Sequence, residues 1–284
     1  MRPAAFEYVA ANSVDEVVVA LAEGDTAVLA GGQSLVLEVT KEERAPRRVV
    51  DINPVAALNT LSQADGVLRV GPLVRHRTFE SQVVGGSLGR LLRAVVAHIG
   101  HPPIRARGTM LGSLAYAHPA AEWPVAAVTL GAEVVLRGPR GCRTVPAADF
   151  FTGPFTTVRR PDELLIEARL PELPEGTGIG YAEDRRVTVF PQAAAMAAVT
   201  VADGLITAAA IGLVNAGPCP VRAAAAEKAL IGGPCSDSAI NAAAEAAAEV
   251  DAAHRSTLDT VPVDRRRAVR VLVRRALTQA REGL

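Results

Sequence analysis

The chain has 284 residues, which is long enough to bury a substantial core in one large domain or two. Its 30 basic and 30 acidic residues balance, so no overall charge favours nucleic acid or an anionic membrane as a partner. The three cysteines are widely separated, which excludes a disulfide framework and an iron–sulfur or zinc site built from this chain alone. No signal peptide opens the chain and no apolar run is long enough for a membrane span, so we expect a cytoplasmic protein.

The first 55 residues predict a compact unit of the β-α-β type. Ser13 and Glu16 have the spacing of a capping box, which begins a helix. A buried strand follows at 27–30, apolar residues at helical spacing occupy 35–39, and a second strand is expected at 49–52.

A second unit follows and extends to about residue 173. Strands are expected at 67–70, 132–136 and 164–170 because these runs are apolar and rich in branched residues. Between the first two, leucine, valine and isoleucine recur at the spacing of one helix face over 88–99, and Gly100 ends that helix.

Proline and glycine punctuate the chain after the third of these strands, at Pro171, Pro174, Gly176, Gly178 and Gly180. These residues are typical of a domain boundary. Beyond them, Asp203-Gly204 between two apolar runs is a strong hairpin signal. Three helices close the chain, at about 222–231, at 237–253 and along an apolar face over 269–280.

Two glycine loops carry the chemical information. The first is Ala30-Gly31-Gly32-Gln33-Ser34-Leu35 and the second is Gly108-Thr109-Met110-Leu111-Gly112-Ser113-Leu114-Ala115. Glycine permits positive φ and close backbone approach, so backbone N–H groups can turn outward toward an anion. The pair predicts a large ligand whose diphosphate is held from both sides. Glu122, close beyond the second loop, suits the hydroxyl groups of a ribose or ribitol chain.

Each signal is weak when taken alone. Neither loop has the G-x-G-x-x-G or Gly-Lys-Ser/Thr spacing of a nucleotide loop, and Gly31-Gly32 alone is more often a tight turn. Arg75, Arg105 and Arg107 are each interpreted as solvated surface, as is the run 265–267 on a helix. The histidines lack metal-ligand spacing and no nucleophile elbow is present, so we predict neither a metal site nor a catalytic residue.

Several segments resemble one known family, in the same order and at the same spacing. They are the first glycine loop, Ile104-Arg105-Ala106-Arg107-Gly108-Thr109, Pro119-Ala120-Ala121-Glu122-Trp123-Pro124, residues 145–153 and Arg274-Arg275-Ala276-Leu277. In these segments the chain resembles the FAD-binding medium subunits of molybdenum hydroxylases, the group that includes carbon monoxide dehydrogenase and xanthine dehydrogenase.

The resemblance implies an α+β fold over nearly the whole chain. It implies a two-subdomain FAD-binding domain of the vanillyl-alcohol-oxidase/PCMH type at 1–173, divided into about 1–55 and 56–173. A smaller C-terminal α+β domain, an antiparallel sheet plus helices, follows at 177–284. The FAD-binding residues that it implies are Ala30, Gly31, Gly32, Gln33, Ser34, Leu35, Thr109, Gly112, Ser113, Ala117 and Glu122.

The function implied by the resemblance is electron transfer. Such a subunit passes electrons from a small [2Fe-2S] partner through FAD to an external acceptor, while a large molybdopterin-binding partner oxidises the substrate. The sequence names neither that substrate nor the acceptor.

The chain also departs from the family pattern. Leu111 stands where a glycine is usual, His118 where an aspartate is common, and residues 187–192 replace a Gly-Asp-Phe-Ala segment near the flavin ring. If position 111 needs positive φ, leucine there costs energy or moves the loop. Two alternatives therefore stay open: a stand-alone FAD-dependent oxidoreductase that acts on a small molecule, and a non-catalytic homologue that has lost flavin.

Overall fold

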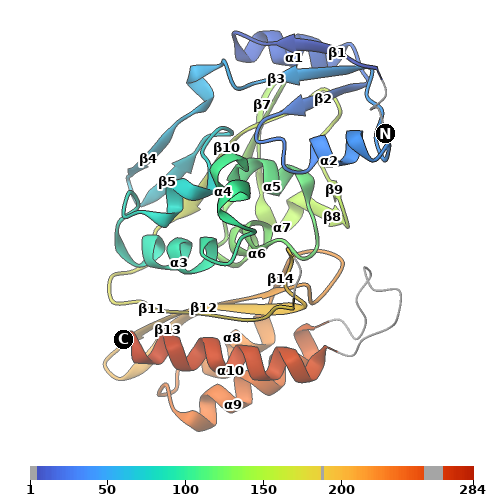
Figure 1. Cartoon of the computed structure of the whole chain (residues 1–284). Helices are drawn as coiled ribbons and strands as arrows, with labels where there is room; N and C mark the ends of the chain where they lie inside the picture. The colour runs from blue at the N-terminus through green and yellow to red at the C-terminus, as the bar shows by residue number, and fades with distance from the viewer. Residues whose placement is uncertain (1–4, 187–188, 253–264) are drawn as a thin grey trace.

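The computed structural model describes residues 5–186, 189–252 and 265–284. Three main sheets follow one another along the chain, each with helices packed on it, and a two-stranded sheet is added to the middle unit (Figure 1). The N-terminal unit lies at the top of that view, the larger central unit in the middle, and the C-terminal sheet with its helices at the bottom. In the described residues, no helix is both long enough and apolar enough to cross a membrane.

The N-terminal unit is a parallel sheet in the order β1-β3-β2. Its elements are β1 (Glu7–Ala10), α1 (Val14–Ala22), β2 (Thr26–Leu29), α2 (Leu35–Thr40) and β3 (Arg48–Asp51). The Oγ atom of Ser13 accepts the N–H of Glu16 at 3.2 Å, which caps α1 as predicted. The Glu16 carboxylate, however, accepts from the N–H of Asn12 at 2.8 Å, one residue earlier than in a regular capping box. The sequence did not predict β1.

The central unit is built on an antiparallel sheet in the order β4-β5-β10-β6-β7. Its strands are β4 (Leu61–Ala64), β5 (Val67–Val70), β6 (Glu133–Gly138), β7 (Gly141–Pro146) and β10 (Leu164–Pro171). Its helices are α3 (Gly86–Val96), α4 (Pro102–Arg107), α5 (Met110–Tyr116), α6 (Glu122–Thr129) and α7 (Ala147–Phe150). Short pieces complete the unit: η1 (Ala56–Leu58), η2 (His76–Glu80), β8 (Phe151–Gly153) and β9 (Thr156–Thr157).

The core of this unit lies beneath α6, all of whose residues are buried. Trp123, 1% exposed, packs against Phe79 with ring centroids 5.3 Å apart. Its indole Nε1 donates to the Nδ1 atom of His76 at 2.9 Å, so this buried polar atom has a partner. That bond ties α6 to η2, which in turn contacts α4.

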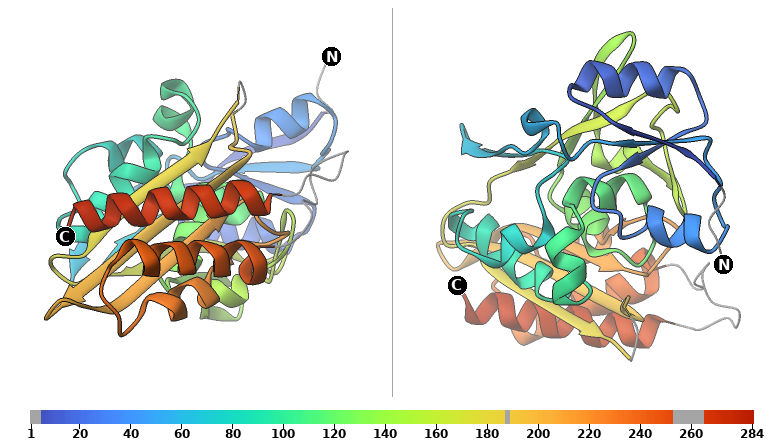
Figure 2. Two further views of the ribbon diagram at one scale, coloured as in Figure 1. Left: turned by 90° about the horizontal axis from the view of Figure 1, so that it is seen from below. Right: turned by 45° about the horizontal axis from the view of Figure 1, so that its top comes forward.

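The C-terminal unit is an antiparallel sheet in the order β11-β12-β13-β14 with helices on one face. Its elements are β11 (Gly178–Asp184), β12 (Ala193–Ala202), β13 (Leu205–Val214), β14 (Val221–Arg222), α8 (Ala224–Leu230), α9 (Asp237–Ala246), the π-helical turn η3 (Ala247–Asp251) and α10 (Arg266–Glu282). The hairpin at Asp203-Gly204 forms as predicted, with both residues at positive φ. Figure 2 shows α10 and α9 lying across the strands, while α3 and α6 of the central unit contact β11 and β13.

Two of the glycines interpreted as a boundary lie inside a strand instead. Gly178 and Gly180 begin β11, on the face that α10 covers. A Cβ atom at Gly178 would lie 1.9 Å from the carbonyl oxygen of Ala280, and one at Gly180 would lie 1.9 Å from that of Ala276. These glycines therefore serve close packing of a helix backbone on the sheet. The connection between the units is shorter, from Pro171 to Gly178.

The second glycine segment is helical rather than an extended loop. Gly108 follows α4 directly, Thr109 is the N-cap of α5, and Gly112 and Ser113 lie within α5. The predicted helix at 237–253 also ends earlier: α9 stops at Ala246 and changes to the π-helical turn, and residue 253 lies outside the described residues.

The close packing of α10 on β11 predicts that adding a methyl group at Gly180 lowers the stability of the fold. Gly180→Ala should lower the free energy of unfolding by about 1–3 kcal/mol, because its Cβ atom would overlap a backbone oxygen that cannot turn away. Denaturant unfolding followed by circular dichroism measures it. Gly233→Ala is the control, since its nearest heavy atom is 3.8 Å away, and it should change stability by less than about 0.5 kcal/mol. Equal effects of the two changes would contradict this account.

Candidate functional site

The two glycine segments lie back to back. A Cβ atom at Gly31 would lie 2.5 Å from the carbonyl oxygen of Arg107 and 2.7 Å from Cα of Gly108. Only glycine at position 31 lets the two backbones approach this closely. The next residue, Gly32, has φ of +74° and turns the chain into α2. The contact that joins the segments is thus built from backbone atoms.

Arg75 holds this contact from the side. Its guanidinium donates to the carbonyl oxygen of Arg107 and to Oδ1 of Asn53, and the Nδ2 atom of Asn53 donates to the carbonyl oxygen of Ala30 at 2.9 Å. The N–H of His76 also donates to the carbonyl oxygen of Gly108 at 2.9 Å. The sequence interpretation of Arg75 as solvated surface is therefore wrong: it connects both segments. Nothing in its sequence neighbourhood signals this role.

The segments present backbone donors at the starts of two helices. Within the described part of the chain, the N–H groups of residues 31–35 have no hydrogen-bond acceptor. In α5, Oγ1 of Thr109 accepts from the N–H of Gly112 at 3.0 Å. A Cβ atom at Gly112 would lie 2.7 Å from this oxygen, so a side chain there would shift the hydroxyl from its present position. The first segment is therefore the freer anion cradle of the two.

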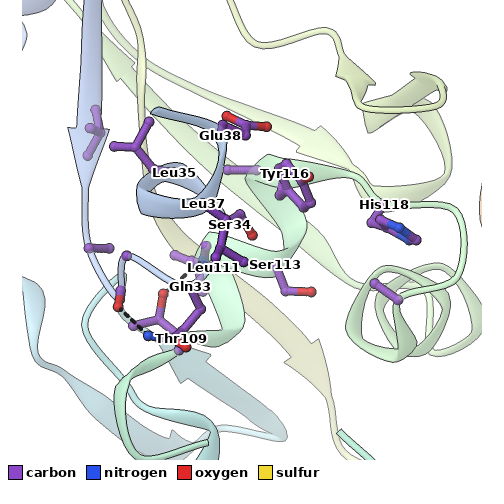
Figure 3. A pocket seen from close by; sticks show the side chains of 18 of the residues that line it. Gln33, Ser34, Leu35, Leu37, Glu38, Thr109, Leu111, Ser113, Tyr116 and His118 are labelled. Atoms are coloured by element: carbon purple, nitrogen blue, oxygen red, sulfur yellow. Dashed lines mark hydrogen bonds between the residues drawn. The ribbon is translucent and has the colours of Figure 1, made fainter. Parts of the chain in front are cut away.

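These segments open into one cavity of about 510 Å³ (Figure 3). Ten of the eleven residues predicted from the resemblance line it: Ala30, Gly31, Gly32, Gln33, Ser34, Leu35, Thr109, Gly112, Ser113 and Glu122. The eleventh, Ala117, is buried at the C-cap of α5 with φ of +52° and does not line the cavity. In Figure 3, Gln33 and Thr109 lie on one side and His118 on the other, with Ser113 between them.

Leu111 does not need the backbone of a glycine. It lies in α5, is absent from the described residues with positive φ, and its side chain is 2% exposed within the central core. The expected cost of a leucine in left-handed backbone does not arise. Leu111 instead gives the cavity part of its apolar floor.

Aromatic side chains gather on the side of the cavity away from the glycines. The rings of His118 and Phe190 stack with centroids 3.7 Å apart and planes 10° from parallel. Phe155 meets the His118 ring edge-on at 5.1 Å, and Tyr116 lies 6.1 Å from it. The N–H of Ala120 donates to Nδ1 of His118 at 3.0 Å, and burial lowers the pKa of His118 to about 4. The imidazole is therefore neutral at pH 7. We call His118 and Phe190 the aromatic wall.

Glu122 is 3% exposed at the start of α6 and is paired across the unit boundary. Arg185, directly after β11, donates from Nη2 to Glu122 at 3.1 Å and to Glu183 at 2.8 Å. Glu183 also pairs with Nδ1 of His98 at 2.9 Å. Burial raises the pKa of Glu122 to about 7, despite the opposing effect of Arg185. Hydrogen bonds from His98 and Arg185 lower the pKa of Glu183 to about 2, although burial opposes them. The Glu122 carboxyl can thus hold or release a proton near neutral pH at the edge of the cavity.

Charged residues that the sequence did not single out line the cavity beside α2. They are Glu38, Lys41, Glu43, Arg44, Arg159 and Glu163. The guanidinium of Arg159 donates to the carbonyl oxygen of Glu163 at 2.7 Å, and burial lowers its pKa. The charged residues at 38–44 and those at 159–163 lie more than 100 residues apart along the chain, so no sequence pattern reveals that they line one cavity.

The donor set fits a dinucleotide and not a metal. A cavity with backbone N–H groups, serine hydroxyls, several carboxyl groups and an aromatic wall suits phosphates, sugar hydroxyls and a planar ring. No cluster of three or more histidine, cysteine or acidic residues with the arrangement of metal ligands occurs among the residues that the structure describes.

Two family models match the chain. One, described as the FAD binding domain in molybdopterin dehydrogenase, matches residues 4–173. The other, described as the CO dehydrogenase flavoprotein C-terminal domain, matches residues 182–280. The chain belongs to this molybdenum hydroxylase flavoprotein family.

Relatives of known function support the same assignment. The chain is 35% identical over 99% of its length to the 6-hydroxypseudooxynicotine dehydrogenase complex subunit alpha of Paenarthrobacter nicotinovorans, and it covers 96% of that protein. It is 33% identical to the carbon monoxide dehydrogenase medium chain of Hydrogenophaga pseudoflava over 87% of both chains. In a solved structure of carbon monoxide dehydrogenase from that organism, a chain superposes with a TM-score of 0.93, covering 100% of this chain and 99% of that one. A chain of quinoline 2-oxidoreductase from Pseudomonas putida 86 gives 0.91 at 30% identity, with 100% and 99% covered.

These comparisons confirm three of the sequence predictions for this flavoprotein: the family, the α+β fold and FAD as the cofactor. The roles of the individual residues that line the cavity stay predictions.

The buried Glu122 carboxyl predicts a pH effect on stability. Because its pKa rises from 4.5 to about 7 on folding, the flavoprotein should lose stability as pH rises through that interval, and Glu122→Gln should not. The free energy of unfolding of the variant relative to the wild type should therefore increase from pH 5 to pH 8. Denaturant titrations at several pH values measure it.

Glu175→Gln is the matched control, since Glu175 is exposed in the connection between the units. It should show no such trend. A flat difference between Glu122→Gln and the wild type across this pH range would contradict the raised pKa.

Proposed function

We propose that this chain is the FAD-binding, electron-transferring medium subunit of a multi-subunit molybdenum hydroxylase, with FAD held in the cavity that both glycine segments line. The observation that carries the proposal is the back-to-back contact of Gly31 and Gly108, which turns two separate segments into one wall of a single cavity. The relatives are named as medium chains or complex subunits, which supports a role within an assembly.

The chain's residues divide the work of holding the cofactor. The N–H groups of residues 31–35 and the hydroxyls of Ser34 and Ser113 would bind the diphosphate oxygens. The Glu122 carboxyl would accept hydrogen bonds from sugar or ribitol hydroxyls. The buried core beneath Leu111 and the aromatic wall would exclude water from the ring.

The proposed role needs partner subunits. Bound FAD supplies the exchange of electrons between one-electron and two-electron carriers. The chain has only three cysteines, and Cys142, Cys219 and Cys235 lie in different elements of the fold, so a [2Fe-2S] cluster belongs to a small partner. A large molybdopterin-binding partner would oxidise the substrate. We also infer that the complex works in the cytoplasm, where free cysteines are usual.

Two alternatives are less well supported. A stand-alone oxidoreductase is less well supported because the chain is 35% identical to, and covers 96% of, a relative that is named as a complex subunit. A homologue without flavin was expected to show a distorted second segment, but Leu111 is accommodated in a regular helix turn.

The proposal predicts a yellow protein that releases FAD on denaturation. Gly31→Ala should weaken FAD binding by about tenfold or more, because its methyl group would push the two segments apart. Fluorescence titration of the apoprotein with FAD measures the dissociation constant, and Gly233→Ala again serves as the control. A colourless wild-type chain that takes up no added FAD would falsify the proposed function.

A further inference from the structure

A buried asparagine joins the C-terminal unit to both sides of the aromatic wall. Asn215 follows β13 directly, is 7% exposed and has φ of +58°, a left-handed conformation that asparagine tolerates better than most residues. The sequence predicts no role for this residue.

Asn215 donates to the two segments that carry the wall. Its Nδ2 atom donates to the carbonyl oxygens of Pro191 and Gln192, each at 3.1 Å. Its backbone N–H donates to the carbonyl oxygen of Pro119 at 3.3 Å. Pro191 follows Phe190 and Pro119 follows His118. One residue thus fixes the backbone next to each stacked ring.

Arg265 orients this asparagine. Arg265 is 4% exposed, so its interpretation as part of a solvated helix face is wrong. Its Nη1 atom donates to the carbonyl oxygen and to Oδ1 of Asn215, both at 3.1 Å. Because Oδ1 accepts from the arginine, the amide nitrogen must point toward the two carbonyl oxygens of the Phe190 segment. The orientation of the amide is therefore set by its partners.

We propose that Asn215, oriented by Arg265, is a positioning residue that keeps His118 and Phe190 stacked as the surface on which the flavin ring of FAD lies. This inference rests on the proposed function and extends it to the ring end of the cavity. Both rings line the cavity, and their stacking at 3.7 Å depends on two chain segments about 70 residues apart. Asn215 is hydrogen-bonded to the residue directly after each ring, so the position of each ring depends on the backbone that Asn215 holds.

The arrangement favours the flavin ring over the adenine ring at this wall. Four of the cavity's aromatic residues gather here: Tyr116, His118, Phe155 and Phe190. The flavin ring system is larger than adenine, so it buries more apolar area against such an aromatic surface. The region beside α2 is instead lined by charged residues such as Lys41 and Arg44, which suit the sugar–phosphate part of the ADP half.

Asn215→Asp tests the inference with almost no change of shape. Aspartate tolerates left-handed backbone and keeps an acceptor for Arg265, but it places an oxygen against the carbonyl oxygens of Pro191 and Gln192. The FAD dissociation constant should rise about tenfold, which is the effect of losing a buried hydrogen bond. The visible circular dichroism of the bound flavin should change, because its ring environment changes.

The affinity for ADP separates the ring end of the cavity from the phosphate end. ADP carries the diphosphate but no flavin ring, so its dissociation constant should stay within about twofold of the wild-type value. Asn241→Asp makes the same chemical change on an exposed face of α9 and should alter neither ligand's binding. Phe190→Leu removes the stacking face directly, and it should reproduce the loss of FAD affinity with ADP binding retained.

The outcomes separate this inference from the proposed function. A wild-type chain that binds no FAD overturns both. If the wild type binds FAD and both Asn215→Asp and Phe190→Leu bind it equally well, with unchanged circular dichroism, the positioning role alone is wrong. An equal loss of ADP and FAD affinity in Phe190→Leu would place the adenine at the wall and would also overturn the inference. Should Asn215→Asp not fold, the Phe190→Leu titrations decide.

Discussion

The close approach of two backbones at Gly31 and Gly108 is the constraint on which the cofactor site depends. The first glycine segment belongs to the N-terminal parallel sheet and the second to the central unit, so each alone offers only half of a binding surface. A side chain at position 31 would occupy the space of a carbonyl oxygen. Arg75 and Asn53 then fix the distance with hydrogen bonds to backbone oxygens of both segments. The end of the cavity at which we propose the phosphates bind is therefore held in place by contacts to backbone atoms.

The opposite end of the cavity depends on the C-terminal unit. Arg185 reaches from β11 to Glu122 on α6 and to the carbonyl oxygen of His98 beyond α3, so one guanidinium satisfies acceptors from three elements. Asn215 and Arg265 do the same behind the aromatic wall. In both cases hydrogen bonds cross the boundary between units, which fixes the relative position of the units more specifically than apolar packing would. The environment of a bound ring would thus respond to changes in a unit that contributes few residues to the cavity.

Local sequence signals predicted those parts of the fold that depend on local physics. The Ser13 cap, the Asp203-Gly204 turn and the helix with its apolar face from Leu88 to Val96 involve residues within a few positions of one another, and each formed. The predicted end of that helix was wrong, because α3 stops at Val96 rather than at Gly100. β1 was not predicted because it is short and mostly exposed. It is a strand because it pairs with β3, which lies 41 residues later in the chain. Gly178 and Gly180 were misinterpreted as linker residues. The α10 backbone that requires glycine at these positions lies about 100 residues further along the chain.

The same distinction explains which site residues could be found in advance. The glycine segments are contiguous, so ten residues chosen from sequence do line one cavity, whereas Ala117 lies in a buried cap one turn too far along α5. Arg75 and Asn215 act through carbonyl oxygens of distant segments, and because every residue type has a backbone carbonyl, such an acceptor cannot be recognised from the sequence. Leu111 shows the converse: it departs from the family pattern, yet α5 needs no positive φ there and the core holds its side chain. A departure from a motif is therefore informative only once the backbone at that position is known, because the same substitution is costly in left-handed backbone and harmless in a helix.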